Sequence, residues 1–467
     1  MMNDTLQELL RVSSRILFCS IVLLSISTYK KVEAAAEGWK AGVGRVVITP
    51  EKSIWMSGYA GRDKPAEGKL HDLWVKAIAF ESGSGKRAVL ISLDLVGISR
   101  QVADQWTALL KKNFSLERSQ IVFCTSHTHC GPVVGETLSS MYFLDEEQQR
   151  DIDEYTSALA EKVNRAVATS IENLHPVALS FATGTATFAV NRRENVEKDV
   201  PALREAGTEL KGPIDHALPT LLVKDLQGNV EAILFGYACH ATTLGFYQWN
   251  GDWPGFAQIE LEKAYPGAVA MFVAGCGADQ NPIPRRTVEL AEKYGKEIAV
   301  AVQNIKEEDQ QSVADNLVTR FQEISIPFSE LPTRSQLETD TMSSDKYIAS
   351  RAKMLLKTLD SAGELSATYP YPIQVWTLGN VNIVFLGGEV VVDYSLRLKG
   401  DLDLPELWVA GYCNDVMAYI PSRRVLLEGG YEGARSMIYY GLPTVWAPQI
   451  ENLIIDQVSK MVASNTE

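Results

Sequence analysis

Apolar, β-branched segments alternate with amphipathic segments along the chain, and this alternation constrains the fold more than any other feature. The run RAVLISLDLVG at 87–97 predicts a strand, the segment at 99–113 predicts a helix, and QIVFCTS at 120–126 predicts a second strand. Strands that alternate with helices are typical of α/β proteins. The sequence therefore predicts an α/β fold with mixed sheets and flanking helices.

The alternation continues toward the C-terminus. We expect helices near 146–172, 254–265, 288–306, 344–360 and 447–463, and strands near 178–190, 218–225, 231–238 and 269–274. Beyond about residue 316 the sequence is richer in β-forming residues, and Gly379-Asn380 between two apolar runs predicts a hairpin. No internal repeat interrupts the chain. We interpret residues 37–467 as one catalytic unit, with the charged stretch 306–316 as the best candidate for a subdomain boundary.

The composition is that of a folded, acidic protein. Hydrophobic residues make up 46% of the chain and charged residues 22%, which is enough apolar material for a large core. The formal net charge is −14, and no basic stripe interrupts the acidic surface. Because nucleic-acid binding requires clustered positive charge, we expect no nucleic-acid partner.

The N-terminus resembles an export signal. Arg11 and Arg15 precede an apolar run at 16–27, and small residues follow at 34–36. A membrane-spanning helix needs about 20 apolar residues, so this run is too short to span a bilayer. We therefore predict a signal peptide at 1–36, export to the periplasm or beyond, and no transmembrane span. An uncleaved N-terminal anchor is the alternative.

The cysteines do not form an obvious disulfide pattern. The chain contains six, and removal of residues 1–36 would leave five. An odd number argues against a disulfide scaffold. We expect buried free thiols, three of which (Cys130, Cys239 and Cys276) lie beside the motifs described next.

Two of the six histidines lie in TSHTHCGP at 125–132, directly after a predicted strand. Residues i and i+2 of an extended segment face the same side. His127 and His129 can therefore reach one metal ion together, or one can bind the metal while the other supports it. The alternative is two polar side chains with ordinary hydrogen-bond partners.

Other polar side chains also follow apolar strands. His240 follows AILFGYAC, and Glu389 follows NIVFLGG. The glycine-bearing segments 271–282 and 407–421 have the same character. Because ligands of α/β sheets bind beyond the carboxyl ends of the strands, we expect these loops to meet at one metal site. Taken singly, His240 is more typical of a hydrogen-bonded structural histidine, and Glu389 of a charge at a helix N-terminus.

Several longer motifs occur in a characteristic order between about residues 42 and 443. They are AGVGRVVITP, MSGYAGR, GKLHDLWVKAIAF, SHTHCGP, NRR, ACHAT, GGE, NDVMAYIPS and GGYEGA. Their order and spacing resemble the catalytic domain of the neutral, non-lysosomal ceramidases of the bacterial type. The resemblance implies a zinc-dependent hydrolase that cleaves the N-acyl bond of a lipid or small-molecule amide.

Residue by residue, the resemblance implies roles for the motif positions. The implied zinc ligands are His127, His240, Glu389 and Tyr419. The resemblance also implies that His129 lies beside the metal, Arg192 near the scissile group and Tyr431 against the substrate.

The sequence departs from the family in two places. Where those ceramidases carry a serine in an SNxGDxSPN-like block, this chain reads AGCGADQNP, so Cys276, Asp279 and Gln280 occupy the region. We also expect the family's C-terminal immunoglobulin-like domain to be absent, because the chain stops at residue 467. In the family that domain is tied to membrane-proximal lipid substrates, so its expected absence argues against ceramide itself as the substrate.

The expected mechanism follows from a zinc-bound water, whose pKa falls to about 7 at such a site. His129 is the first candidate to handle a proton, and Asp279 is the alternative unless it serves a turn or a helix cap. Asp94 is either a charge near a helix N-terminus or a partner that orients His127 or His129. Water is favoured over Cys276 as nucleophile, since nothing in GCGADQ would lower the pKa of a thiol.

Three other functions remain open at the level of sequence. The first is a zinc hydrolase of another amide or an ester, such as an N-acylated sugar or peptide. The second is an exported binding protein without catalysis. The third is a cysteine hydrolase that uses Cys130 or Cys276 with a nearby histidine.

Overall fold

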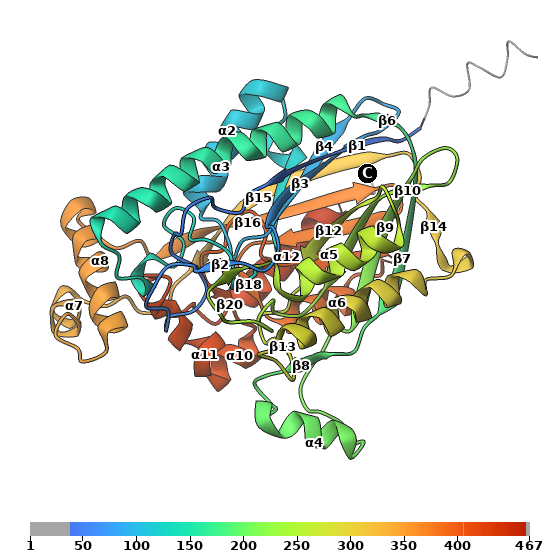
Figure 1. The fold of residues 1–467 in the computed structure, drawn as a ribbon. Coiled ribbons are helices and arrows are strands. Elements are labelled where there is room, and N and C mark those ends of the chain that lie inside the picture. The colour runs from blue at the N-terminus through green and yellow to red at the C-terminus, as the bar shows by residue number, and fades with distance from the viewer. Residues whose placement is uncertain (1–37, 405, 464–467) are drawn as a thin grey trace, which may run out of the picture.

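Three β-sheets pack around a shared apolar core, and helices cover the outer face of each sheet (Figure 1). The computed structural model describes residues 38–404 and 406–463. The shared core contains Ile78 and Leu90 from the first sheet, Leu234 from the second, and Trp376 and Phe385 from the third. The expected signal peptide at 1–36 lies outside the described residues.

The first sheet has the strand order β5-β4-β3-β1-β6. Its strands are β1 (Lys40–Val47), β3 (Trp74–Glu81), β4 (Arg87–Leu93), β5 (Ile121–Thr125) and β6 (His175–Pro176). β4 and β5 run parallel, and the other neighbours run antiparallel. The covering helices are α2 (Arg100–Phe114) and α3 (Glu146–Glu172). Val75 and Ala77 share the helix-side cluster with Trp106 and Val163, while Ile78 enters the shared core, because successive side chains of a strand point to opposite faces.

The second sheet has the order β12-β10-β9-β7-β14. Its strands are β7 (Ala178–Thr185), β9 (Ala217–Lys224), β10 (Val230–Tyr237), β12 (Val269–Ala274) and β14 (Gln311–Ser312). β10 and β12 are the parallel pair. The covering helices are α5 (Asp252–Ala264) and α6 (Val288–Gln303). Leu261 and Ile298 of these helices pack in one cluster with Ile233 and Phe235 of β10.

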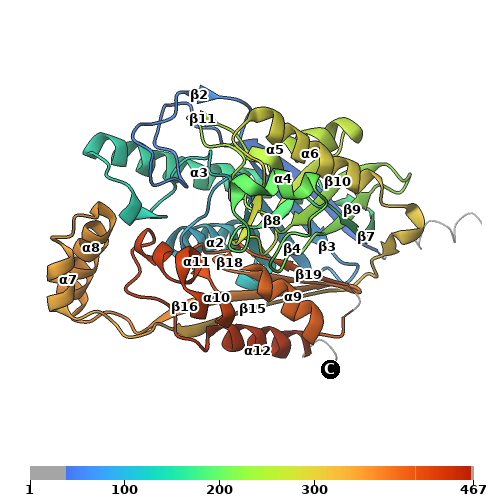
Figure 2. The same ribbon diagram turned by 90° about the horizontal axis from the view of Figure 1, so that it is seen from below.

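The third sheet has the order β15-β16-β17-β19. Its strands are β15 (Leu317–Pro327), β16 (Thr368–Leu378), β17 (Val381–Leu386) and β19 (Leu407–Ala410), and β17 and β19 run parallel. The covering helices are α9 (Val392–Asp401) and α12 (Ile450–Ala463), which lie beneath the sheet in Figure 2. Leu398 and Ile454 of these helices share a cluster with Val384 of β17.

Short elements complete the fold. Three two-stranded sheets pair β2 (Gly68–Lys69) with β11 (Gln248–Trp249), β8 (Ala189–Asn191) with β13 (Gln280–Pro282), and β18 (Glu389–Val390) with β20 (Tyr419–Ile420). The remaining α-helices are α4 (Val200–Glu205), α7 (Arg334–Asp340), α8 (Lys346–Ala362), α10 (Arg423–Glu428) and α11 (Gly430–Gly433). The 3-10 helices are η2 (Arg118–Gln120), η3 (Ser139–Met141), η4 (Glu197–Asp199), η5 (Glu307–Asp309) and η6 (Arg435–Ile438). α7 and α8 project together from one end of the molecule (Figures 1 and 2).

The predicted α/β class, with mixed sheets and flanking helices, is confirmed. The predicted helix at 146–172 matches α3, and the hairpin at Gly379-Asn380 joins β16 to β17. The expected strand at 178–190 is instead two strands in different sheets, because β8 leaves β7 to pair with β13. The sequence did not predict α7, which packs against α8 through Leu337.

Further expectations concern the membrane and the thiols. Within the described ranges, no helix combines the length and apolar character needed to cross a membrane. The five cysteines of the described chain are free and buried, as expected. The stretch 306–316 contains β14 and leads from the second sheet to the third, and a subdomain boundary there stays a prediction.

Candidate metal centre

Side chains from all three sheets meet at one buried point. His127 follows β5, His240 follows β10, and Glu389 follows β17 at the start of β18. Tyr419 begins β20 and is the register partner of Glu389 in the parallel pair, so the two side chains lie on the same side. These four side chains are only 1–3% exposed. The structure therefore brings together the four residues that the sequence proposes as metal ligands.

The two histidines present the same ring nitrogen to this point. His127 Nδ1 lies 2.5 Å from the carbonyl oxygen of Val96, and His240 Nδ1 lies 2.9 Å from that of Gly277. A carbonyl oxygen only accepts hydrogen bonds, so each Nδ1 carries a proton and each Nε2 is the nitrogen available to a metal ion. These Nε2 atoms lie 3.2 Å and 3.1 Å from Oε2 of Glu389.

The chemistry of this donor set fits a divalent cation. Burial lowers the pKa of His240 to about 4, so its ring is neutral at pH 7. Among the described residues, Oε2 of Glu389 has no hydrogen-bond donor, and it faces the Nε2 atoms of both rings. A cation among them would relieve the repulsion, and two histidines with a carboxylate are a common zinc-binding set.

His129 belongs to the same cluster. Its Nε2 lies 3.2 Å from Nε2 of His127, and one ring nitrogen from each of His127, His129 and His240 lies within 4.8 Å of the others. Burial lowers the pKa of His129 well below its usual value, so this ring is also neutral at pH 7. Gly58 has a φ of +95°, and a Cβ there would meet the His129 ring at 2.6 Å, so glycine lets the chain pack directly on the ring. His129 is placed to act either as a ligand or as the neighbour of one.

Arg192 and Tyr431 adjoin the fourth proposed ligand. Arg192 Nη2 donates to the Tyr419 hydroxyl at 3.1 Å, and that hydroxyl lies 3.3 Å from Nε2 of His240. The Tyr431 ring lies 5.3 Å from the Tyr419 ring. The structure thus places both sequence-proposed residues beside the cluster. It also distinguishes Arg192 from Arg193: both pair with Glu432, but only Arg192 contacts Tyr419, and Arg193 pairs with Glu428 as well.

The glycine-rich loop at 275–282 holds the site together through its backbone. The carbonyl oxygen of Gln280 accepts from the His240 amide at 3.0 Å, and that of Asp279 accepts from the Arg192 amide at 2.9 Å. Gly277 orients the His240 ring through its carbonyl oxygen, as described above. A Cβ at Gly277 would meet the amide nitrogen of Cys239 at 2.5 Å, so only glycine allows this close approach.

Left-handed backbone conformations also gather around the cluster. The φ angles of His127, Asp252, Tyr412 and Asn414 are 58°, 55°, 57° and 63°. The Tyr412 ring packs 4.4 Å from the His127 ring. The Asp252 carboxylate accepts hydrogen bonds from the amides of Thr243 and Leu244, shortly after His240. Such conformations cost free energy in residues other than glycine, and they concentrate at functional sites.

The sequence analysis missed Tyr440 as a residue of the site and did not predict the contact that Trp253 makes. The Tyr440 hydroxyl donates a short hydrogen bond to Oε1 of Glu389, which leaves Oε2 to face the histidines. Trp253 Nε1 donates to the His240 carbonyl oxygen at 2.9 Å, and Trp253 is fully buried, so it supports the site from within the core. Neither residue carries a local sequence signal for this role.

Two acidic residues have partners outside the cluster. The carboxylate of Asp279 accepts from the amide of Val392 at 3.0 Å and from the Asn191 side chain at 3.2 Å, so it caps α9. Burial raises the pKa of Asp279 to about 6. Asp94 accepts from the Trp74 amide at 2.9 Å. Neither acid has a hydrogen bond to His127 or His129 among the described residues.

The cysteines near the site lack the features of a nucleophile. Burial raises the pKa of Cys130 to about 12 and also raises that of Cys276. A catalytic cysteine needs a depressed pKa and some exposure, and both thiols are buried. The structure therefore argues against a cysteine hydrolase.

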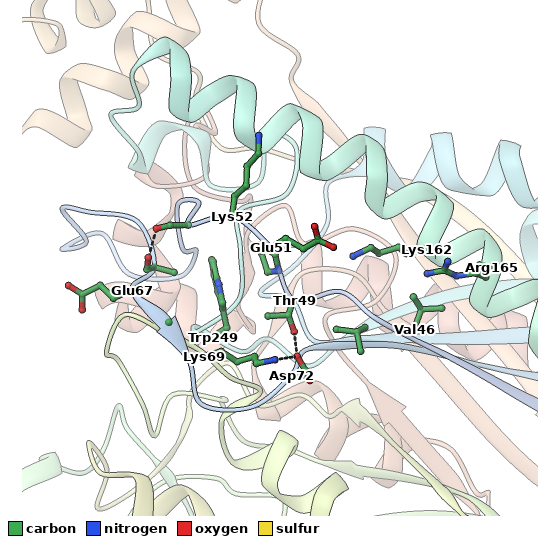
Figure 3. A pocket seen from close by; sticks show the side chains of 15 residues that line it. Val46, Thr49, Glu51, Lys52, Glu67, Lys69, Asp72, Lys162, Arg165 and Trp249 are labelled. Atoms are coloured by element: carbon green, nitrogen blue, oxygen red, sulfur yellow. Dashed lines mark hydrogen bonds and ion pairs between the residues drawn. The ribbon is translucent and has the colours of Figure 1, made fainter.

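One pocket adjoins the proposed metal ligands, and another lies away from the clustered histidines. A pocket of about 680 Å³ includes Arg192 and Tyr431 in its wall and therefore adjoins the proposed ligands. Another, of about 910 Å³, lies between α3 and the segment after β1 and contains the Lys69–Asp72 ion pair beside Trp249 (Figure 3). None of the clustered histidines lines the pocket of Figure 3.

Comparison with known proteins gives a consistent result. The family described as "Neutral/alkaline non-lysosomal ceramidase, N-terminal" matches residues 39–281, more than half of the chain. A crystal structure of neutral ceramidase from Pseudomonas aeruginosa shares the fold, with a TM-score of 0.69 at 18% identity over 90% of this chain and 73% of that chain. A structure described as ceramidase complexed with C2 has a TM-score of 0.67 at 17% identity over 90% and 74%. A search of curated proteins by sequence found no match.

Proposed function

Since this chain belongs to the neutral/alkaline non-lysosomal ceramidase family, we propose that it is a zinc-dependent hydrolase that cleaves an N-acyl amide bond. The family and the shared fold support a ceramidase-like hydrolase. One observation carries the metal-dependent part of the proposal. The Nε2 atoms of His127 and His240 face Oε2 of Glu389 at 3.2 Å and 3.1 Å in a buried site, and this oxygen has no hydrogen-bond donor among the described residues.

The proposed ligands are His127, His240, Glu389 and Tyr419. A zinc ion bound there would supply a Lewis acid and lower the pKa of water to about 7. The chain's own groups fix the ligand geometry, because backbone carbonyls orient both histidines and Tyr440 orients Glu389.

The residues around the ligands would serve the reacting amide. Arg192 brings a positive charge beside Tyr419, where it can stabilise the oxyanion that forms when water attacks the carbonyl. Tyr431 would contact the substrate from the same side. His129 is neutral and lies beside His127, so we assign it the uptake of a proton from the attacking water.

Metal analysis paired with a substrate panel tests this function. We expect about one tightly bound zinc per chain, by the usual arrangement of protein ligands and water. Absence of zinc, both after purification without chelator and after reconstitution, would remove the basis of the mechanism. The panel should contain acyl amides, esters and phosphoesters. Phosphoester cleavage without amide or ester cleavage would refute the proposed chemistry.

Two alternatives give different results in the same experiment. Zinc binding with no hydrolysis across the panel would favour an exported binding protein. Cleavage of esters but not of amides would favour a zinc esterase. A pocket lined by Arg192 and Tyr431, which both adjoin Tyr419, favours catalysis over binding alone.

We also propose export through residues 1–36, on the basis of Arg11, Arg15 and the apolar run that follows them. N-terminal sequencing of the protein recovered from its natural host should find a start near residue 37. Recovery of intact protein beginning at Met1 in the cytoplasmic fraction would contradict this.

A further inference from the structure

The pocket beside the proposed ligands has a highly polar wall. It has a volume of about 680 Å³ and is lined by Arg192, Arg193, Glu194, Asn195, Glu197, Asn281, Arg285, Glu428, Gly430, Tyr431 and Glu432. Arginine, glutamate and asparagine supply all of these side chains except those of Gly430 and Tyr431. No aliphatic residue lines the pocket.

The charges of this wall compensate one another. Arg285 pairs with Glu197 at 2.6 Å, and Arg192 pairs with Glu432 at 2.8 Å. Arg193 bridges Glu432 at 2.6 Å and Glu428 at 2.9 Å. Three guanidinium groups thus stand against four carboxylates, so the wall offers both donors and acceptors without an excess of positive charge.

Such a wall disfavours a hydrocarbon chain. Burial of a methylene group contributes about 0.8 kcal/mol only when it enters apolar surroundings. Here an alkyl chain would displace water from ionised groups, which is unfavourable because it gives them no replacement hydrogen bonds. The pocket of Figure 3 is no better suited to a tail, since Lys52, Glu67, Lys69, Asp72 and Arg165 are among its lining residues.

We infer that the pocket takes a neutral, polyhydroxylated group, so that the substrate is a water-soluble N-acyl amino sugar and not a two-chain lipid. This inference rests on the proposed function. Hydroxyl groups both donate and accept, so they can bond to the glutamates and to the arginines at once. The half-buried Tyr431 ring offers a flat apolar surface for the C–H face of a sugar ring. An anionic amide finds no free cation there, because each guanidinium group of the wall is already paired with a carboxylate.

Three amides of different character test the inference with the zinc-loaded protein. They are N,N′-diacetylchitobiose, N-hexanoylsphingosine and N-acetylglycine. We expect kcat/KM for the sugar amide to exceed that for each of the other two by at least about tenfold, as the loss of one or two charge-assisted hydrogen bonds would produce. A higher kcat/KM for N-hexanoylsphingosine or N-acetylglycine would overturn the inference and leave the proposed function intact.

A binding measurement separates this inference from the proposed function. If neither these three amides nor any amide or ester of the wider panel is hydrolysed, the proposed function fails, and calorimetric titration of N,N′-diacetylchitobiose then tests the pocket alone. Saturable binding of the sugar would still support the inference. Absence of binding at millimolar sugar would overturn it.

Matched variants locate the binding in this pocket. Arg285→Met removes a pocket cation, whereas Arg100→Met removes a comparable ion pair, to Glu323 at 2.9 Å, on α2. We expect Arg285→Met to weaken sugar binding about tenfold without changing the zinc content, and Arg100→Met to bind like the parent protein. Glu194→Leu is a second pocket variant, since its ion pair with Arg424 is as long as 3.9 Å and its loss should not disturb folding. Unchanged sugar affinity in both folded pocket variants would overturn the inference.

Discussion

Replacement of Glu389 by glutamine should change the stability of the protein in opposite directions with and without zinc. Oε2 of Glu389 lies 3.2 Å and 3.1 Å from Nε2 of His127 and His240 and receives no hydrogen bond from the residues that the structure describes. The two amide hydrogens of a glutamine could each be donated to one of these nitrogens. Its oxygen could still accept from Tyr440.

The magnitude follows from these contacts. Each new hydrogen bond between neutral groups contributes about 0.5–1.5 kcal/mol, so the metal-free Glu389→Gln variant should exceed the metal-free parent in unfolding free energy by about 1–3 kcal/mol. Zinc at a thousandfold its dissociation constant adds about 4 kcal/mol to the parent. The variant lacks the charged ligand and should gain less than about 1 kcal/mol at the same zinc concentration. The order of stabilities should therefore reverse when zinc is added.

Urea denaturation followed by tryptophan fluorescence, with chelator or with zinc, measures all four stabilities. Glu432→Gln is the matched control, because Glu432 is a similarly buried carboxylate that pairs with Arg192 and Arg193. This variant should be less stable than the parent protein both with chelator and with zinc. The reasoning fails if metal-free Glu389→Gln is less stable than the metal-free parent. It also fails if zinc stabilises the two proteins equally.

Three further changes test other parts of the site and the fold. His127→Ala should abolish both zinc binding and turnover, whereas His129→Ala should lower the rate more than the zinc content, because His129 is assigned beside the ligand set; equal loss of zinc in elemental analysis would make His129 a ligand. Cys276→Ala should keep most of the activity, because burial raises the pKa of this thiol and disfavours a thiolate. Covalent catalysis would be shown if the variant is folded and zinc-loaded but inactive, and if mass spectrometry finds an acyl adduct on Cys276 of the parent protein. Burial raises the pKa of Asp415 from 3.8 to about 7, so the folded protein should lose stability as the pH rises from about 4 to about 7. Asp415→Asn should remove this loss and raise the unfolding free energy by up to about 4 kcal/mol at pH 8 and by little at pH 4. Urea denaturation at both pH values measures the two differences, and equal differences would contradict the prediction.

The long elements were predictable from the sequence because their signals are local. The helix α3 has an apolar stripe along its 27 residues and begins after Asp145, whose side chain forms a capping box with Gln148. β10 and β12 are continuous apolar runs bounded by turn residues. Periodicity over such lengths identifies an element without knowledge of its neighbours.

The short strands were not predictable in the same way. β8, β13, β18 and β20 have only two or three residues each, which is too few to show a period. They form because distant segments meet, as where Glu389 pairs with Tyr419 across 30 positions of the chain. The elements that place two of the proposed ligands are therefore those with the weakest local signal.

The candidate site shows the same division. His127 and His240 were found because each is a polar residue directly after an apolar strand. Tyr440 was missed, since its contact with Glu389 joins residues 51 positions apart and leaves no pattern in the sequence around it. Asp279 was a reasonable candidate for proton transfer by its motif, but its hydrogen bond to the Val392 amide spans 113 positions and assigns it to a helix cap.

The proposed metal ligands come from all three sheets, so zinc binding can show whether two halves of the chain assemble into the native fold. The two histidines precede residue 281, where the family match ends, while Glu389 and Tyr419 follow it. Two separately produced polypeptides, divided within 306–316, would each hold an incomplete set of donors. Neither half should retain zinc through dialysis, and a mixture should do so only when the halves associate in the native arrangement. Retained zinc would then report the reassembly of a divided chain.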